Sequence, residues 1–138
     1  MTVLGSTPPP MPTGHALVRF AEDLETLLDA AGAANAWTMT PAQLQGVLPR
    51  LTRAAARLAE IELRVLAEAD RAKVGDDVGA TNTASASWWA HLTGQRPPAA
   101  HGRTKLARRL DDDHEPTRSA LAAGRVNVEQ ARVILDST

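Results

Sequence analysis

Residues 40–73 read "TPAQLQGVLPRLTRAAARLAEIELRVLAEADRAK", and this stretch predicts the longest helix of the chain. Thr40 suits the N-cap, Pro41 suits the first helical position, and Gln43 is placed to complete a capping box. The strong helix formers Ala, Leu, Arg and Glu dominate the residues that follow. Pro49 lacks a backbone N–H, so we expect it to kink or divide this helix.

Apolar residues recur along this helix at alternating steps of four and three, which define a seam: Val47, Leu51, Ala54, Leu58, Ile61 and Val65. Four more leucines lie off the seam, at positions 44, 48, 63 and 66. Because the helix is apolar on more than one side, we expect neighbouring helices of the chain to bury it. The alternative is that the 40–73 helix pairs with a partner or with a second copy, which would make the protein a homodimer.

The composition of the whole chain favours an all-α fold. Of the 138 residues, 43% are hydrophobic, but there is one Phe, three Trp and no Tyr, so Leu, Val, Ile and Ala must build the core. The β-branched residues are too scattered for a sheet. We therefore expect a multi-helix bundle with a long central helix.

Proline and glycine divide the chain into segments. Residues 1–14, "MTVLGSTPPPMPTG", contain four Pro and predict a disordered leader. N-terminal helices follow over residues 15–73, the first of them from about His15 to Ala31 with an apolar stripe. The Gly- and Asp-rich residues 74–82 predict a linker, and residues 83–138 predict a second helical unit.

Several classes of function find no support in the sequence. The net charge is −1, so no global field draws the protein to nucleic acid or to a membrane. The absence of Cys fits a cytoplasmic protein, and no apolar run predicts a signal peptide or a membrane span. The four histidines, at positions 15, 91, 101 and 114, lack metal-ligand spacing. We therefore predict no catalytic residue, no metal, no cofactor and no small-molecule substrate.

The segments 83–94 and 98–112 predict two short helices that resemble a helix-turn-helix. Ala86, Ala90 and Gly94 recur at steps of four, which allows close helix approach and a backbone turn. Three residues of the second helix are expected to pack onto the first: Ala100, Leu106 and Leu110.

The second helix of this pair is strongly cationic, with no acid between Arg96 and Leu110. If an apolar face of Ala99, Gly102, Leu106 and Leu110 packs inward, the positive side chains form a strip on the surface. We predict phosphate contacts from five residues of this strip: Arg96, Arg103, Lys105, Arg108 and Arg109. The alternative is a solvated face balanced by the acids just downstream, Asp111 to Asp113 and Glu115.

The C-terminal segments carry a resemblance to a known family. "SWWAHLTG", "AHGRTKLARRL" and "SALAAGRVNVEQARVI" resemble the 13E12 repeat family, also called DUF222, an all-helical domain that typically precedes an HNH endonuclease module in actinobacterial proteins. The resemblance covers roughly residues 40–138. The following residues fit the family pattern: Trp88 or Trp89, Thr93, Gly94, Ala100, Leu106, Ala107, Arg108, Leu110, Leu121, Gly124, Ala131 and Arg132.

The resemblance implies a non-catalytic helical module that binds or positions DNA. A fainter similarity to the helix-turn-helix region of ParB-like partition proteins also implies DNA as the partner. Gln95, Pro97 and Pro98 depart from the pattern where a recognition helix begins, which favours phosphate contact over base reading. An HNH module would lie beyond Thr138, so we expect this chain to be one part of a larger nuclease-type design.

Overall fold

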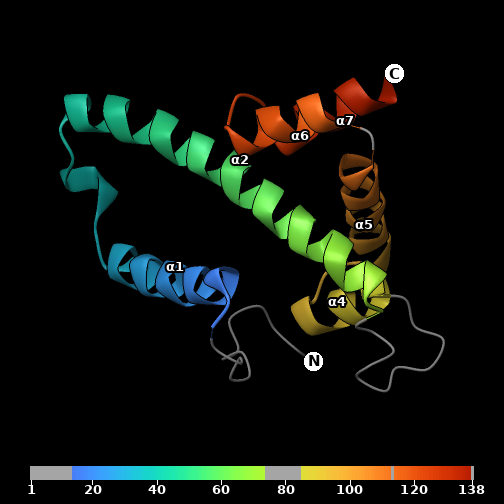
Figure 1. Cartoon of the computed structure of the whole chain (residues 1–138). Coiled ribbons are helices and arrows are strands. Elements are labelled where there is room, and N and C mark those ends of the chain that lie inside the picture. Colours follow the sequence, from blue (N-terminus) through green and yellow to red (C-terminus); the bar gives the residue numbers. More distant parts are fainter. Residues whose placement is uncertain (1–13, 74–84, 113, 138) are drawn as a thin grey trace. The chain divides into compact units, whose positions relative to one another are not determined.

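A computed structural model describes residues 14–73, 85–112 and 114–137, and all regular structure among them is helical. The prediction of an all-α fold is therefore confirmed. Figure 1 shows the α-helices in order along the chain, with the short 3-10 helix η1 (Ala36–Thr38) between the first two. The α-helices are α1 (Ala16–Gly32), α2 (Pro41–Arg71), α4 (Ser85–Thr93), α5 (Pro97–Asp111), α6 (Glu115–Ala122) and α7 (Val128–Asp136).

The chain divides into two compact units, and the boundary between Gly46 and Val47 lies within α2. The first unit holds α1, η1 and the first turns of α2. The second unit holds the rest of α2 together with α4 to α7. The predicted leader, except Gly14, and the predicted linker lie outside the described residues.

Local sequence rules set the helix starts. The backbone N–H of Gln43 donates to Thr40 Oγ1 at 3.2 Å, and the N–H of Thr40 donates to Gln43 Oε1 at 2.9 Å, which confirms the capping box. Asn127 and Gln130 form the same reciprocal pair at the start of α7. Pro49 does not divide α2, which is continuous from residue 41 to residue 71. A proline removes one hydrogen bond from a helix. The strong helix formers before and after Pro49 keep α2 continuous despite this loss.

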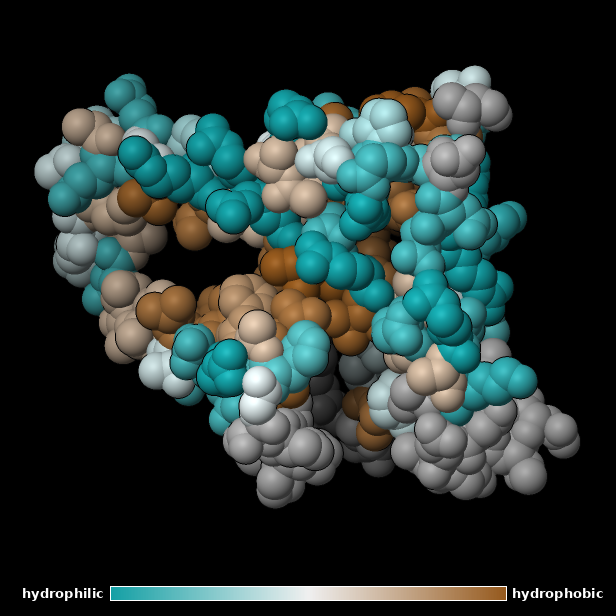
Figure 2. All heavy atoms as spheres, viewed as in Figure 1, coloured by the Kyte–Doolittle hydropathy of each residue, from teal (hydrophilic) through white to brown (hydrophobic). Residues whose placement is uncertain are grey.

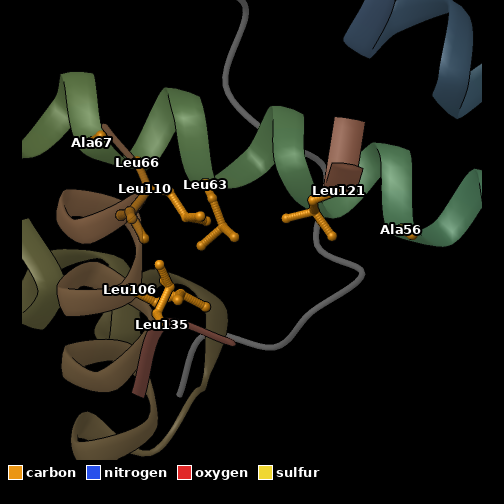
Figure 3. Close-up of a cluster of buried hydrophobic side chains, with 9 residues drawn as sticks. Ala56, Leu63, Leu66, Ala67, Leu106, Leu110, Leu121 and Leu135 are labelled. Carbon is orange, nitrogen blue, oxygen red and sulfur yellow. The ribbon is translucent and has the colours of Figure 1, made fainter. Parts of the chain in front are cut away.

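The core of the second unit joins α2 to the three C-terminal helices. Its buried leucines come from α2, α5, α6 and α7: Leu63, Leu66, Leu106, Leu110, Leu121 and Leu135. Figure 3 shows the α2 and α5 leucines pointing toward one another. Burying a leucine contributes about 1.5–3 kcal/mol, so this cluster is the main apolar contribution that fixes α2 against α5, α6 and α7.

The predicted corner between α4 and α5 is confirmed in its packing. Ala86, Ala90 and Ala100 are buried, and Gly94 has a φ of 73°, a left-handed conformation that favours glycine. The Thr93 hydroxyl donates to the Trp89 carbonyl at 2.7 Å and so satisfies a group at the end of α4.

The buried face of α5 differs from the predicted one. Ala99 and Gly102 are exposed, whereas Ala100, Thr104 and Ala107 are buried beside the leucines of the core. Thr104 enters this face at little cost because its hydroxyl donates to the Ala100 carbonyl at 2.9 Å.

The predicted burial of the α2 seam is largely wrong. Val47, Leu51, Leu58 and Val65 are exposed, and the buried apolar residues of α2 are Ala56, Leu63, Leu66 and Ala67. The C-terminal helices pack on the opposite side of α2, where Leu63 and Leu66 supply the apolar contact. A second apolar face of α2 is therefore left at the surface.

The turn between α6 and α7 approaches α2 at Gly124. This residue has a φ of 76°, and a Cβ at its position would overlap the Arg53 Cγ and lie 3.1 Å from the Arg53 carbonyl oxygen. A glycine is required here for two reasons, the left-handed backbone and the close approach of the Arg53 backbone.

We expect Gly124→Ala to lower the free energy of unfolding by about 1–3 kcal/mol, because both the backbone conformation and the contact with Arg53 resist a methyl group. Gly102→Ala is the matched control. Gly102 lies within α5, and a methyl group at its α-carbon would meet nothing within 4 Å, so its replacement should stabilise the helix by up to about 1 kcal/mol. Urea unfolding followed by circular dichroism measures both; equal effects of the two substitutions would contradict this account.

Candidate functional site

The five cations predicted to contact phosphate lie on α5 or directly before it. Arg96, Lys105 and Arg108 are exposed, whereas Arg103 and Arg109 are half-buried. The structure places four of them on one helix, but it also brings carboxylates from other helices to three of them. Their ion pairs decide how much positive charge this surface offers.

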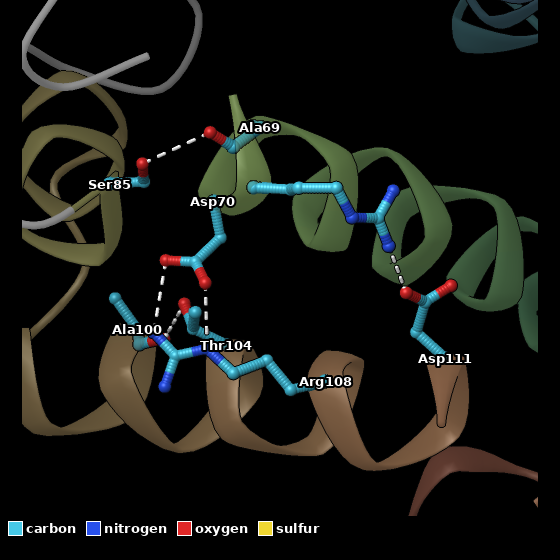
Figure 4. Close-up of polar contacts among 8 residues, drawn as sticks. Ala69, Asp70, Ser85, Ala100, Thr104, Arg108 and Asp111 are labelled. Carbon is cyan, nitrogen blue, oxygen red and sulfur yellow. Dashed lines mark hydrogen bonds and ion pairs between the residues drawn. The ribbon is translucent and has the colours of Figure 1, made fainter. Parts of the chain in front are cut away.

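Arg108 binds Asp70 at the C-terminal end of α2. Its Nε and a terminal nitrogen donate to the two carboxylate oxygens of Asp70 at 2.7 Å and 3.0 Å (Figure 4). This bidentate geometry is the strongest form of an arginine–carboxylate contact. The hydrogen bonds from Arg108 hold the pKa of Asp70 below its ordinary value, against the opposing effect of partial burial.

Arg103 and Arg109 also lie between helices. A terminal nitrogen of Arg103 donates to Glu62 of α2 at 2.7 Å, while its Nε is buried without a hydrogen-bond partner. The Arg103 side chain is half-buried because its position lies on the buried face of α5. Arg109 donates to Asp136 at 2.7 Å and to the Leu135 carbonyl at 2.6 Å, which joins α5 to α7.

The acids that neutralise the strip are not the ones the sequence suggested. Asp111 pairs with Arg71 of α2, and Glu115 pairs with Arg118 of its own helix. The strip is balanced instead by Glu62, Asp70 and Asp136, which lie 41, 38 and 27 residues away from their partners. No local pattern could have identified these pairs, since only the packing of α5 between α2 and α7 brings them together.

Two of the five predicted cations keep their charge available. Arg96 and Lys105 are exposed, and neither forms an ion pair within the part of the chain that the structure describes. The cationic surface on α5 is therefore much smaller than the sequence predicted.

The second candidate surface is the exposed side of α2. We define the α2 apolar face as Val47, Leu48, Leu51, Leu58 and Val65, whose exposed fractions are 38, 68, 61, 38 and 48%. Apolar residues reach the surface along the N-terminal half of α2, whose other side is polar (Figure 2). The four-and-three spacing in the sequence identified four of these five residues, but it could not show that they are exposed in the folded protein.

No catalytic arrangement is seen in residues 14–73, 85–112 and 114–137. No three His, Asp or Glu side chains in these ranges gather as metal ligands. The Ser87 Oγ and the His101 Nε2 lie 3.3 Å apart at the surface. A cavity of about 10 Å³ beside Glu60 and Arg118 has room for a single water at most. Within the same ranges, no helix has the length and apolarity that a membrane crossing needs.

Comparison with known proteins adds no assignment. No protein-family model matches the chain, and no match was found among the curated proteins or the solved structures. The resemblance to the 13E12 repeat family stays a prediction from the quoted segments.

We expect Asp70→Asn to lower the free energy of unfolding by about 0.5–1 kcal/mol at neutral pH, a small effect because Arg108 is largely exposed. The pKa of Asp70 is lowered in the folded protein. The contribution of the Asp70 carboxylate to the free energy of unfolding is therefore fully present above the pKa of an unfolded aspartate, about 3.9. It is lost as the pH falls through the lower pKa of Asp70 in the folded protein.

The difference between the parent protein and Asp70→Asn should accordingly be constant from neutral pH to about pH 5 and should shrink below about pH 4. Asp112→Asn is the control, because Asp112 is exposed at the end of α5 and makes no ion pair in the described residues. Urea unfolding across this pH range measures the effect; a difference that grows on acidification would rule out the assigned role of the pair.

Proposed function

We propose that this chain is a non-catalytic helical protein-interaction module that binds its partner through the α2 apolar face. The single observation that carries the proposal is Leu51, 61% exposed in the middle of a helical seam. The seam spacing is that of a helix that docks another helix. Monomeric proteins seldom leave a continuous apolar surface of this kind without a binding role.

The anchoring of α2 supports the same function. Its opposite side is fixed by the leucine core, and the ion pair between Asp70 and Arg108 joins the C-terminal end of α2 to α5. A binding face on a helix that is already held in place requires little ordering when a partner arrives. Each leucine of the face that becomes fully buried would contribute about 1.5–3 kcal/mol before the costs of association.

The test is capture of partners from an extract of the source cells, identification of each captured protein, and reconstitution with the purified partner. We expect Leu51→Glu to reduce reconstituted binding at least about a hundredfold while circular dichroism and the unfolding midpoint stay unchanged, since the side chain is exposed. Leu63→Glu should instead unfold the second unit, because Leu63 is buried in the core. Partners that bind the Leu51→Glu variant as tightly as the parent protein would contradict the proposal.

DNA binding is a second candidate, favoured by Arg96 at the corner between α4 and α5 and by Lys105 in the middle of α5. This corner has the glycine turn of a helix-turn-helix unit, and the resemblance to the 13E12 repeat family implies DNA as well. With two phosphate contacts in place of five, the binding would be weak and would depend little on sequence.

We expect any duplex DNA binding to show a log–log salt slope of about −2, in place of the about −4.5 that five contacts would give. Lys105→Ala should remove about 0.9 from the slope, and Arg103→Ala should leave it unchanged, because Arg103 is held by Glu62. Fluorescence anisotropy between about 50 and 200 mM salt measures this. Undetectable binding at the lower salt would exclude the DNA-binding candidate.

A further inference from the structure

The outer side of α5 carries three cations within one helical turn. Arg108 and Arg109 stand three and four residues after Lys105, the spacing at which side chains on a helix are neighbours. Lys105 and Arg108 are exposed, and Arg109 is half-buried. We call these three residues the α5 cation cluster.

Two carboxylates from other helices bind the arginines of this cluster. Arg108 donates to both carboxylate oxygens of Asp70 on α2, at 2.7 Å and 3.0 Å (Figure 4). Arg109 donates to the Asp136 carboxylate at the end of α7, at 2.7 Å. These two acids compensate two of the three positive charges. Lys105 is the member of the cluster that forms no ion pair in the described residues.

Both ion pairs can be exchanged, because each contains a group in contact with solvent. The Arg108 side chain is 57% exposed, and the Asp136 side chain is 63% exposed. Ion pairs at the surface contribute little to stability. A phosphate group offers an arginine the same charge-assisted hydrogen bonds as a carboxylate. A phosphate that also contacts Lys105 would therefore compete well with either acid.

Arg103 is bound in a different way. It stands two residues before Lys105, which places it about 200° away around the helix. Its Nε is buried, and a terminal nitrogen donates to Glu62 of α2 at 2.7 Å. Because Arg103 lies on the buried face of α5, loss of Glu62 would not bring it into the cluster.

We infer that the α5 cation cluster is a phosphate-binding site for duplex DNA, which Asp70 and Asp136 neutralise in the free protein. Binding exchanges the two carboxylates for phosphate oxygens, and it releases two of the contacts that hold α5 to α2 and α7. This inference rests on the DNA-binding candidate. It adds how that site is regulated, since the chain's own acids keep its affinity low.

The test is duplex DNA binding by the full chain with Asp70→Asn and Asp136→Asn combined. The amides keep the size of the side chains and remove both charges. At about 50 mM salt we expect at least about tenfold tighter binding than by the parent protein, and a log–log salt slope steeper by about 1.8, as two more phosphate contacts give. Fluorescence anisotropy measures both. Equal affinities and slopes would overturn the inference and leave the DNA-binding candidate standing.

Glu62→Gln is the matched control for Asp70→Asn alone. Each substitution removes one carboxylate that binds an arginine of α5, and each changes the net charge by one unit. Asp70→Asn should steepen the salt slope by about 0.9, and Glu62→Gln should leave it unchanged. The same gain from both substitutions would attribute the effect to net charge and would overturn the inference.

A comparison in two backgrounds tests the Arg108–Asp70 pair directly. Arg108→Gln should change DNA binding little in the parent protein, where Asp70 compensates Arg108. In the Asp70→Asn variant, the same substitution should weaken binding about tenfold at about 50 mM salt. Circular dichroism checks that each variant is folded. Equal losses in the two backgrounds would contradict the role given to Asp70.

The remaining outcomes separate this inference from the candidate on which it rests. Binding by the doubly substituted variant but not by the parent protein would support neutralisation by the two acids and exclude DNA binding by the parent. Binding by neither would overturn both. Displacement of the DNA by inorganic phosphate at an equal phosphate concentration would assign the cluster to free phosphate and overturn DNA as its ligand.

Discussion

The contact of two leucines of α2 with the C-terminal helices is the interaction on which the second unit depends. Leu63 and Leu66 meet Leu106 and Leu110 of α5, and Leu121 and Leu135 complete the cluster from α6 and α7. The chain has few aromatic residues, so its core must be assembled from leucines contributed by separate helices. Once these leucines are buried, the position of α5 beside α2 is set, and with it the surroundings of every charged residue on α5.

That position turns the predicted phosphate-binding strip into a set of structural ion pairs. Arg103 and Arg108 reach Glu62 and Asp70 of α2, and Arg109 reaches the end of α7. Such pairs contribute modestly to stability at the surface, but they specify how α5 is oriented between its neighbours. The same guanidinium groups could bind phosphate only by releasing these carboxylates, so orientation of α5 and capture of a polyanion compete for one set of side chains.

The same constraint gives α2 two different faces. One face is used by the core, and the side chains of the predicted seam stay at the surface because α4 to α7 contribute no cover for them. A helix held on one side and apolar on the other is suited to binding a second helix. The proposed binding function thus depends on the apolar face of α2 that the core leaves exposed.

The sequence by itself determined the helical class, the capping box at Thr40, the glycine turn at Gly94 and the set of leucines available for burial. These features depend on neighbouring residues, so periodicity and local hydrogen bonding suffice to predict them. Only the tertiary structure decided which of the two apolar faces of α2 is buried, and that Asp70 and Glu62 neutralise arginines on α5. The physical reason is that both outcomes depend on how helices distant in sequence pack, and either face of α2 offered enough leucine to be buried.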